Sequence, residues 1–80
     1  MKYNEIFDKV ADMLLDQLNL NREDIKPESR LVEDLGADSA NVLILVCDME
    51  NEFGIEVEND VLTSIQTVDD VVKYLEKNVK

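Results

Sequence analysis

Apolar residues recur at helical spacing in the first segment of the chain, from about Tyr3 to Leu18. Charged residues such as Asp8, Lys9 and Asp12 occupy positions between them. Apolar side chains repeating every three to four residues are typical of a helix that buries one face. The pattern therefore predicts an amphipathic helix whose apolar face consists of Ile6, Phe7, Val10, Met13, Leu14 and Leu18.

A second helix is predicted from about Ser39 to Phe53, and it is apolar on two sides. Gly54 follows it, and glycine suits the left-handed residue just past a helix end. At about 100° per residue, one face carries Val42, Leu45, Val46, Met49 and Phe53, and the other carries Ala40, Leu43, Ile44, Cys47 and Asn51. The first face belongs in the core. The second is either covered by neighbouring segments or exposed as a contact surface for a partner.

The last helix is predicted to begin at Thr67 and to run toward Val79. Thr67 and Asp70 have the spacing of a capping box, in which each side chain bonds to the backbone of the other residue. The core face of this helix consists of Val68, Val71, Val72 and Leu75. The chain thus has three segments with strong helical periodicity.

Two connections complete the predicted fold. Residues 19–38 lose the helical pattern and contain Pro27 and Gly36, so we expect a long loop held to the core at Leu20, Ile25, Leu31 and Leu35. Residues 55–60 (IEVEND) alternate as a strand would, but one short strand has nothing to pair with. Residues 61–65 (VLTSI) can form one or two helical turns. The predicted fold is all-α, a small four-helix bundle with three main helices, a short third helix and a long first loop.

Length and composition indicate one small cytoplasmic domain, residues 1–80. The chain has 80 residues, 45% of them hydrophobic, with two glycines, one proline and no low-complexity linker. The longest apolar run, from Val42 to Cys47, is far too short to cross a bilayer. The charged N-terminus is unlike a signal peptide. Because Cys47 is the only cysteine and histidine is absent, an internal disulfide and a Cys/His metal cluster are both excluded.

The charge of the chain restricts its partners. Acidic residues outnumber basic ones by 19 to 8, which gives a formal net charge of -11. Nucleic acid is therefore not an expected partner, because binding to phosphates depends on Lys and Arg. Proteins with basic patches are favoured instead, although the acidity also serves solubility.

Ser39 is the candidate for chemistry. It lies at the predicted start of the second helix, where free N–H groups and the helix dipole favour a phosphate. Serine often caps a helix, but Asp38 can do this and leave the Ser39 hydroxyl free. With no histidine and with every lysine remote in sequence, no base is available to activate that hydroxyl. We therefore expect Ser39 to be modified by another enzyme, and no catalytic residue is predicted.

The segment LVEDLGADS, followed by an apolar helix and EFGIEV, resembles the acyl carrier protein family. The resemblance extends from KVADMLLDQLNLNREDIKPES to IQTVDDVVKYLEK, nearly the whole chain. It implies that Ser39, flanked by Asp38 in the motif, receives 4′-phosphopantetheine from coenzyme A and that acyl groups are carried on the terminal thiol as thioesters. It also implies a monomeric carrier, not an enzyme, with an apolar interior that shelters the acyl chain. Its pathway would be fatty acid, polyketide or another specialised acyl synthesis.

The resemblance further implies that the second helix docks onto a phosphopantetheinyl transferase and onto enzymes that load, elongate and release the acyl group. The chain departs from the family pattern here, since Ala40, Asn41, Ile44 and Asn51 replace a usual leucine and usual acidic residues. We expect the partner-binding residues to be Ala40, Leu43, Ile44, Cys47, Asp48 and Glu50. Apolar burial contributes about 25 cal/mol per Å², whereas exposed ion pairs contribute little. Partners should therefore be more apolar and less basic than typical fatty-acid enzymes.

Three other interpretations remain open from the residues. An unmodified interaction module would keep the fold and bind a protein through the apolar face of the second helix. A calcium sensor is less favoured because DLGADSANVLIL lacks the ligand spacing of an EF-hand, although Glu56, Glu58 and Asp60 could bind cations loosely. A redox role for Cys47 is also less favoured than packing or interface contact, because no Lys or Arg lies near it in sequence.

Overall fold

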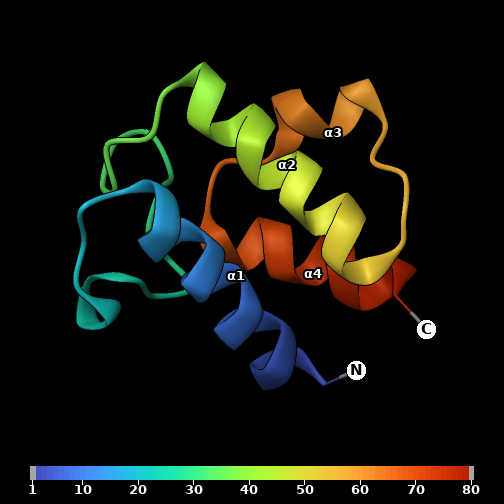
Figure 1. Cartoon of the computed structure of the whole chain (residues 1–80), viewed down its shortest axis with the longest axis horizontal. Helices are drawn as coiled ribbons and strands as arrows, with labels where there is room; N and C mark the ends of the chain where they lie inside the picture. Colours follow the sequence, from blue (N-terminus) through green and yellow to red (C-terminus); the bar gives the residue numbers. More distant parts are fainter. Residues whose placement is uncertain (1, 80) are drawn as a thin grey trace.

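The computed structural model describes residues 2–79, apart from the side chains of Asn59 and Leu62. Four α-helices follow one another along this part of the chain, with one short 3₁₀ turn, η1, after the first (Figure 1). Their bounds are Tyr3–Gln17 for α1, Arg22–Asp24 for η1, Ser39–Phe53 for α2, Asn59–Ser64 for α3 and Val68–Asn78 for α4. Residues 2–79 form no β-strand, so the predicted all-α bundle is confirmed.

The three long helices lie within one residue of the positions that their apolar spacing predicts. The short helix α3 starts earlier than expected, because it takes in the last two residues of IEVEND, while residues 55–58 are irregular. The chain also turns once in η1, which the sequence did not indicate. None of the helices within residues 2–79 has the length and apolar character needed to span a membrane.

The core is formed mainly where α1 and α4 pack together and α2 crosses α1. All four predicted core residues of α4 are fully buried, because they recur at helical spacing along one side. In α1 the buried residues are Ile6, Val10, Ala11 and Leu14. Phe7, Met13 and Leu18, also predicted for this face, are only half-buried and pack against the edge of the core.

The loop between α1 and α2 forms the left side of the molecule in Figure 1 and leads to the start of α2. Three of its four predicted anchors, Ile25, Leu31 and Leu35, are buried, and Leu20 is half-buried against the core. Backbone bonds hold the loop to the start of α4. The N–H groups of Val68 and Asp69 donate to loop carbonyls at 3.0 and 2.8 Å, and Leu31 N–H donates to the Gln66 carbonyl at 2.9 Å. Because the first N–H groups of a helix have no partner within it, the bonds of Val68 and Asp69 also stabilise α4.

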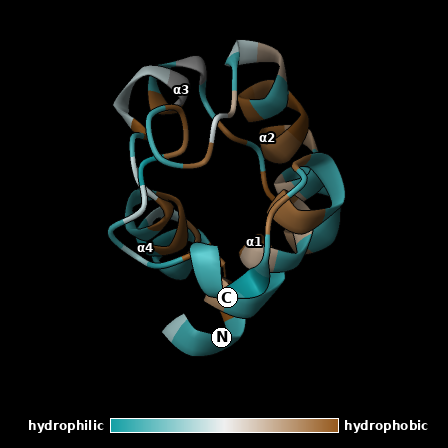
Figure 2. Ribbon diagram, turned by 90° about the vertical axis from the view of Figure 1, so that its left-hand side faces the viewer, coloured by the Kyte–Doolittle hydropathy of each residue, from teal (hydrophilic) through white to brown (hydrophobic). Residues whose placement is uncertain are grey.

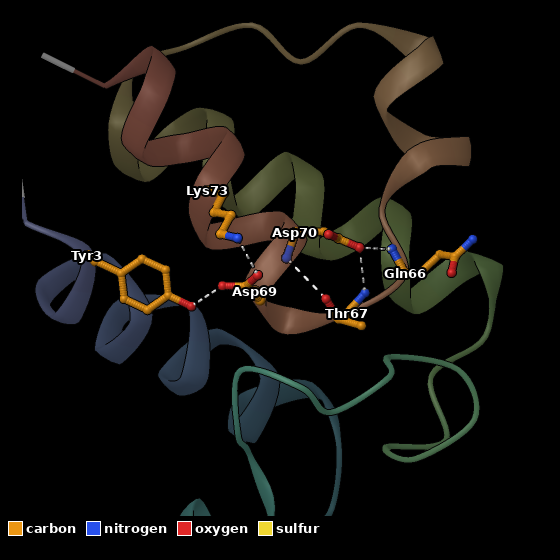
Figure 3. Close-up of polar contacts among 6 residues, drawn as sticks. All are labelled: Tyr3, Gln66, Thr67, Asp69, Asp70 and Lys73. Atoms are coloured by element: carbon orange, nitrogen blue, oxygen red, sulfur yellow. Dashed lines mark hydrogen bonds and ion pairs between the residues drawn. The ribbon is translucent and has the colours of Figure 1, made fainter.

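Polar contacts at the start of α4 attach it to α1 (Figure 3). Thr67 and Asp70 form the predicted capping box, with Asp70 N–H donating to Thr67 Oγ1 at 3.2 Å and Thr67 N–H donating to the Asp70 carboxylate at 3.1 Å. The Tyr3 hydroxyl, on α1, donates to Asp69, which also pairs with Lys73 at 3.1 Å. Burial and this bond raise the pKa of Tyr3 to about 12. The bonds from Tyr3 and Lys73 lower the pKa of Asp69.

Candidate functional site

The chain enters α2 through a bend that places Asp38 and Ser39 at the surface. Gly36 has a φ of 75°, in the left-handed region that glycine adopts at little cost. Ala37 is then buried, and its N–H donates to the Leu31 carbonyl at 2.9 Å. The buried alanine fixes the backbone just before α2, so that the next two residues are exposed.

Asp38 is the N-cap of α2, as predicted. Its carboxylate accepts from Asn41 N–H at 2.9 Å, and its own N–H donates to the Asn41 side-chain oxygen at 3.2 Å. These two bonds form a complete capping box without Ser39. Among the described residues the Ser39 hydroxyl makes no hydrogen bond, and its side chain is exposed. The hydroxyl is therefore available for modification.

The start of α2 fits a phosphate group on Ser39. The first turn contains no acidic residue, and the N–H groups of Ser39 and Ala40 have no partner within residues 2–79. Free N–H groups at a helix start favour an anion, while the Asp38 carboxylate is already engaged with Asn41. A phosphodiester attached to Ser39 Oγ would thus meet the positive end of the α2 dipole.

An open groove of about 700 Å³ lies beside Ser39. The loop before α2, the first turns of α2 and the segment from α3 to α4 form its walls. Apolar side chains provide much of its lining, and an exposed ion pair between Arg30 and Glu33 lies on the loop side. The lining residues are Arg30, Leu31, Val32, Glu33, Ser39, Val42, Leu43, Thr63, Ile65 and Gln66.

The two faces of α2 differ in burial, as their positions at about 100° per residue predict. Leu45, Val46 and Met49 are buried, and Val42 and Phe53 are half-buried. On the opposite face all four apolar residues are exposed, namely Ala40, Leu43, Ile44 and Cys47. The alternative that the loop and α3 cover these residues is therefore wrong. Much of the α2 ribbon is hydrophobic in Figure 2, unlike that of α4, where one side is hydrophilic.

Val32 is a surface residue that the sequence pattern did not indicate. Its side chain is 59% exposed and lines the same groove as Leu43, which is 51% exposed. With Ile44, which is 49% exposed, they are the large apolar side chains most exposed in the described part of the chain. We call Val32, Ala40, Leu43, Ile44 and Cys47 the apolar patch. The exposure of Val32 could not be predicted from the spacing of apolar residues, because that spacing does not determine the conformation of a loop.

The acidic residues of α2 lie further along the helix. Asp48 and Glu50 are half-buried, and Glu50 accepts from Val57 N–H at 3.0 Å, so this carboxylate also holds the segment after α2. No group of three His, Cys, Asp or Glu side chains in the described part of the chain is arranged to hold a metal ion. This applies to Glu56, Glu58 and Asp60 as well.

Comparisons with known proteins identify the family. Residues 8–75 match the family model described as a phosphopantetheine attachment site. The acyl carrier protein of Wolinella succinogenes is 48% identical over 91% of this chain and 96% of its own, and that of Thermotoga maritima is 41% identical over 94% and 93%. The solved structure of an acyl carrier protein from Enterococcus faecalis superposes with a TM-score of 0.82 at 29% identity, over 98% of this chain and 99% of its own.

The match thus defines a class, proteins that carry a phosphopantetheine attachment site. This chain belongs to the acyl carrier protein family within that class. Its cofactor is accordingly a covalently attached 4′-phosphopantetheine, and the groups at the start of α2 suit the phosphate of that cofactor.

Proposed function

We propose that the protein carries acyl groups as thioesters on a 4′-phosphopantetheine arm attached to Ser39 Oγ. The observation that carries the proposal is the exposed Ser39 hydroxyl at the start of α2, which takes no part in the capping box of Asp38 and Asn41. When attached, the arm supplies the thiol that bears the acyl group. The chain itself supplies the attachment point, the helix start that favours the phosphate, and the surface that partners bind.

The chain is proposed to be a carrier and not a catalyst. Attachment requires a base to take the proton of the Ser39 hydroxyl. The sequence has no histidine, and the near neighbour Asp38 is occupied as the cap of α2. The transferase would therefore supply the base, and later enzymes would supply the acyl chemistry.

The groove beside Ser39 is the proposed shelter for the acyl chain. It begins at the attachment point, and Leu31, Val42 and Ile65 are among its apolar lining residues. Apolar surface removed from water contributes about 25 cal/mol per Å², so an acyl chain gains free energy by lying in the groove. The Arg30–Glu33 ion pair lies on the loop side of the groove, where it is exposed to solvent.

The apolar patch is proposed to contact the enzymes that act at Ser39, together with Asp48 and Glu50 from further along α2. An enzyme that forms a bond to Ser39 must cover the surface around it, and Ala40 and Leu43 lie on the first turns of the same helix. The acidic side chains of α2 begin only at Asp48. A partner that fits this surface is apolar opposite Leu43 and Ile44 and basic only toward the end of the helix.

The sign of one substitution distinguishes an apolar partner from a basic one. If the transferase surface is apolar, Ile44→Glu raises the KM for the carrier about tenfold, because a charge is then desolvated. If that surface is basic, Ile44→Glu lowers the KM, and the proposal is wrong. Asn4→Glu adds the same charge at an exposed position of α1 and is the matched control, with an expected KM within about twofold of wild type.

The protein is further proposed to act as a monomer, as one domain of residues 1–80, in the cytoplasm. The net charge of -11 opposes self-association, and an exposed, unpaired Cys47 suits a reducing compartment. Sedimentation under reducing conditions should give the mass of one chain. A dimer that persists on dilution would contradict this part of the proposal.

The experiment that tests the function is incubation with coenzyme A and a phosphopantetheinyl transferase, followed by intact-protein mass spectrometry. The wild-type protein should gain one phosphopantetheine, and Ser39→Ala should gain none. Ser64→Ala is the matched control and should be modified normally, because Ser64 is equally an exposed serine of a helix, but its hydroxyl donates to the Val61 carbonyl at 3.0 Å. An unmodified wild-type protein would refute the proposal and favour the interaction module.

A further inference from the structure

We infer that Gln17, the last residue of α1, is a positioning residue for the attachment reaction. Its side-chain amide holds the first two turns of α2, and with them Ser39, against α1. This inference rests on the proposed role of Ser39 and extends it to a residue that is 22 positions away in the sequence and belongs to another helix.

The amide of Gln17 lies against the backbone of α2. In the orientation that satisfies both of its polar atoms, Nε2 donates to the Asn41 carbonyl at 2.9 Å and Oε1 accepts from Leu45 N–H at 3.3 Å. A carbonyl and the N–H four residues later are the two groups that an α-helix joins to each other. A side chain that contacts both must offer a donor and an acceptor at once. Glutamine does so, whereas methionine and ionised glutamate do not.

Asn41 connects this contact to the attachment site. Its N–H and its side-chain oxygen are both bonded to Asp38 in the capping box, and its carbonyl accepts from Gln17. Ser39 lies between Asp38 and Asn41 in the sequence. Asn41 is therefore bonded both to Asp38, which precedes Ser39, and to Gln17 of α1. In this way the backbone on both sides of the Ser39 hydroxyl is held in place from α1.

The other polar link between α1 and α2 in the described part of the chain lies near the opposite end of α2. There, Lys9 Nζ pairs with Glu52 Oε1 at 2.8 Å, and both side chains are more than 40% exposed, at 42% and 46%. Ion pairs exposed to this extent contribute little to stability. Gln17 is half-buried, and its contact adjoins the turn that carries Ser39. The placement of that turn therefore depends on Gln17 more than on Lys9.

The kinetic test compares Gln17→Met and Gln17→Glu with wild type, using coenzyme A and a phosphopantetheinyl transferase well below the unfolding temperature. Because the docking surface is left intact, we expect kcat for attachment to fall about three- to tenfold with KM within about twofold of wild type. Lys9→Met is the matched control, since it also removes an α1–α2 link, and it should leave kcat unchanged. A wild-type kcat in both Gln17 variants overturns the inference, as does an equal loss in Lys9→Met.

Hydrogen exchange of the Leu45 amide tests the contact itself, without the transferase. At neutral pH both Gln17 variants should exchange this amide about tenfold faster than wild type. A protonated carboxyl has an O–H donor and a carbonyl acceptor, so the Gln17→Glu difference should disappear below the usual glutamate pKa of about 4.3. The Gln17→Met difference should persist there. Equal protection in all three proteins at neutral pH would overturn the inference.

The two proposals fail in different ways. If the wild-type protein gains no phosphopantetheine, the role of Ser39 is wrong, and the positioning role falls with it. If the wild-type protein is modified at Ser39 but both Gln17 variants react at the wild-type rate, only the positioning role is wrong.

Discussion

Leu45 and Ile44 are adjacent in α2, yet the structure assigns them opposite environments. Leu45 is 1% exposed in the core, whereas Ile44 is 49% exposed in the apolar patch. Replacing each by alanine therefore compares a core residue with a docking residue at neighbouring backbone positions. The comparison tests whether the second apolar face of α2 belongs to the fold or to a partner.

The expected magnitudes follow from burial. Leu→Ala at a fully buried site costs about 2–5 kcal/mol, because it removes buried methyl groups and leaves a cavity. Full burial of an isoleucine side chain is worth about 1.5–3 kcal/mol, and Ile44 is only about half removed from water, so Ile44→Ala should cost about 1 kcal/mol or less. A chain of this size has a total stability of about 4–12 kcal/mol.

Urea unfolding followed by far-ultraviolet circular dichroism measures both free energies of unfolding. If Leu45→Ala is unfolded before urea is added, Leu45→Val supplies a milder core substitution that should still cost more than Ile44→Ala. The two-face account of α2 is refuted if Ile44→Ala costs as much as the core substitution. It is also refuted if Leu45→Ala leaves the midpoint unchanged.

Three further outcomes are expected. Asp38→Ala should lower stability by about 0.5–2 kcal/mol, because it removes the cap of α2, whereas Ser39→Ala should change the urea midpoint little. Gly54, with a φ of 65° at the end of α2, has open space where a Cβ would lie, so Gly54→Ala should cost about 1–2 kcal/mol from the backbone alone. Burial and the bond to Asp69 raise the pKa of Tyr3 to about 12, so the fold favours the neutral phenol; the stability linked to this preference is fully present below pH 10 and is lost as pH rises through about 12. The lowered pKa of Asp69 means that its carboxylate stabilises the fold above the usual aspartate pKa, and that this stabilisation is lost as pH falls through the pKa of Asp69 in the folded protein. The thermal unfolding temperatures of wild type and Tyr3→Phe should therefore converge at both low and high pH.

The helices could be predicted from the sequence because their causes are local. The apolar spacing of α1 and α4, the Thr67–Asp70 box, and Gly54 after α2 each act within a few residues, and all three helices begin and end close to their predicted bounds. The start of α3 was less predictable. A helix of six residues has little periodicity to detect.

The candidate site was only partly predictable. Ser39 and the helix cap Asp38 could be predicted from their position at the start of an apolar helix. The angular positions of the residues along α2 also predicted which of its faces is buried. The groove, the exposure of Val32 and the contact of Gln17 with Asn41 depend on segments that are distant in the sequence. Spacing along one helix carries no information about which turn of another helix it touches, so these features required the structure.

Protein isolated from its native cell shows whether Ser39 bears the acyl-carrying arm. Trypsin leaves Ser39 and Cys47 together in residues 31–73, so fragmentation of that peptide in a mass spectrometer must locate the attached group. We expect 4′-phosphopantetheine on Ser39, with the acyl group on its thiol. A bare Ser39, or an acyl group on Cys47 instead, would show that Ser39 is not the attachment site.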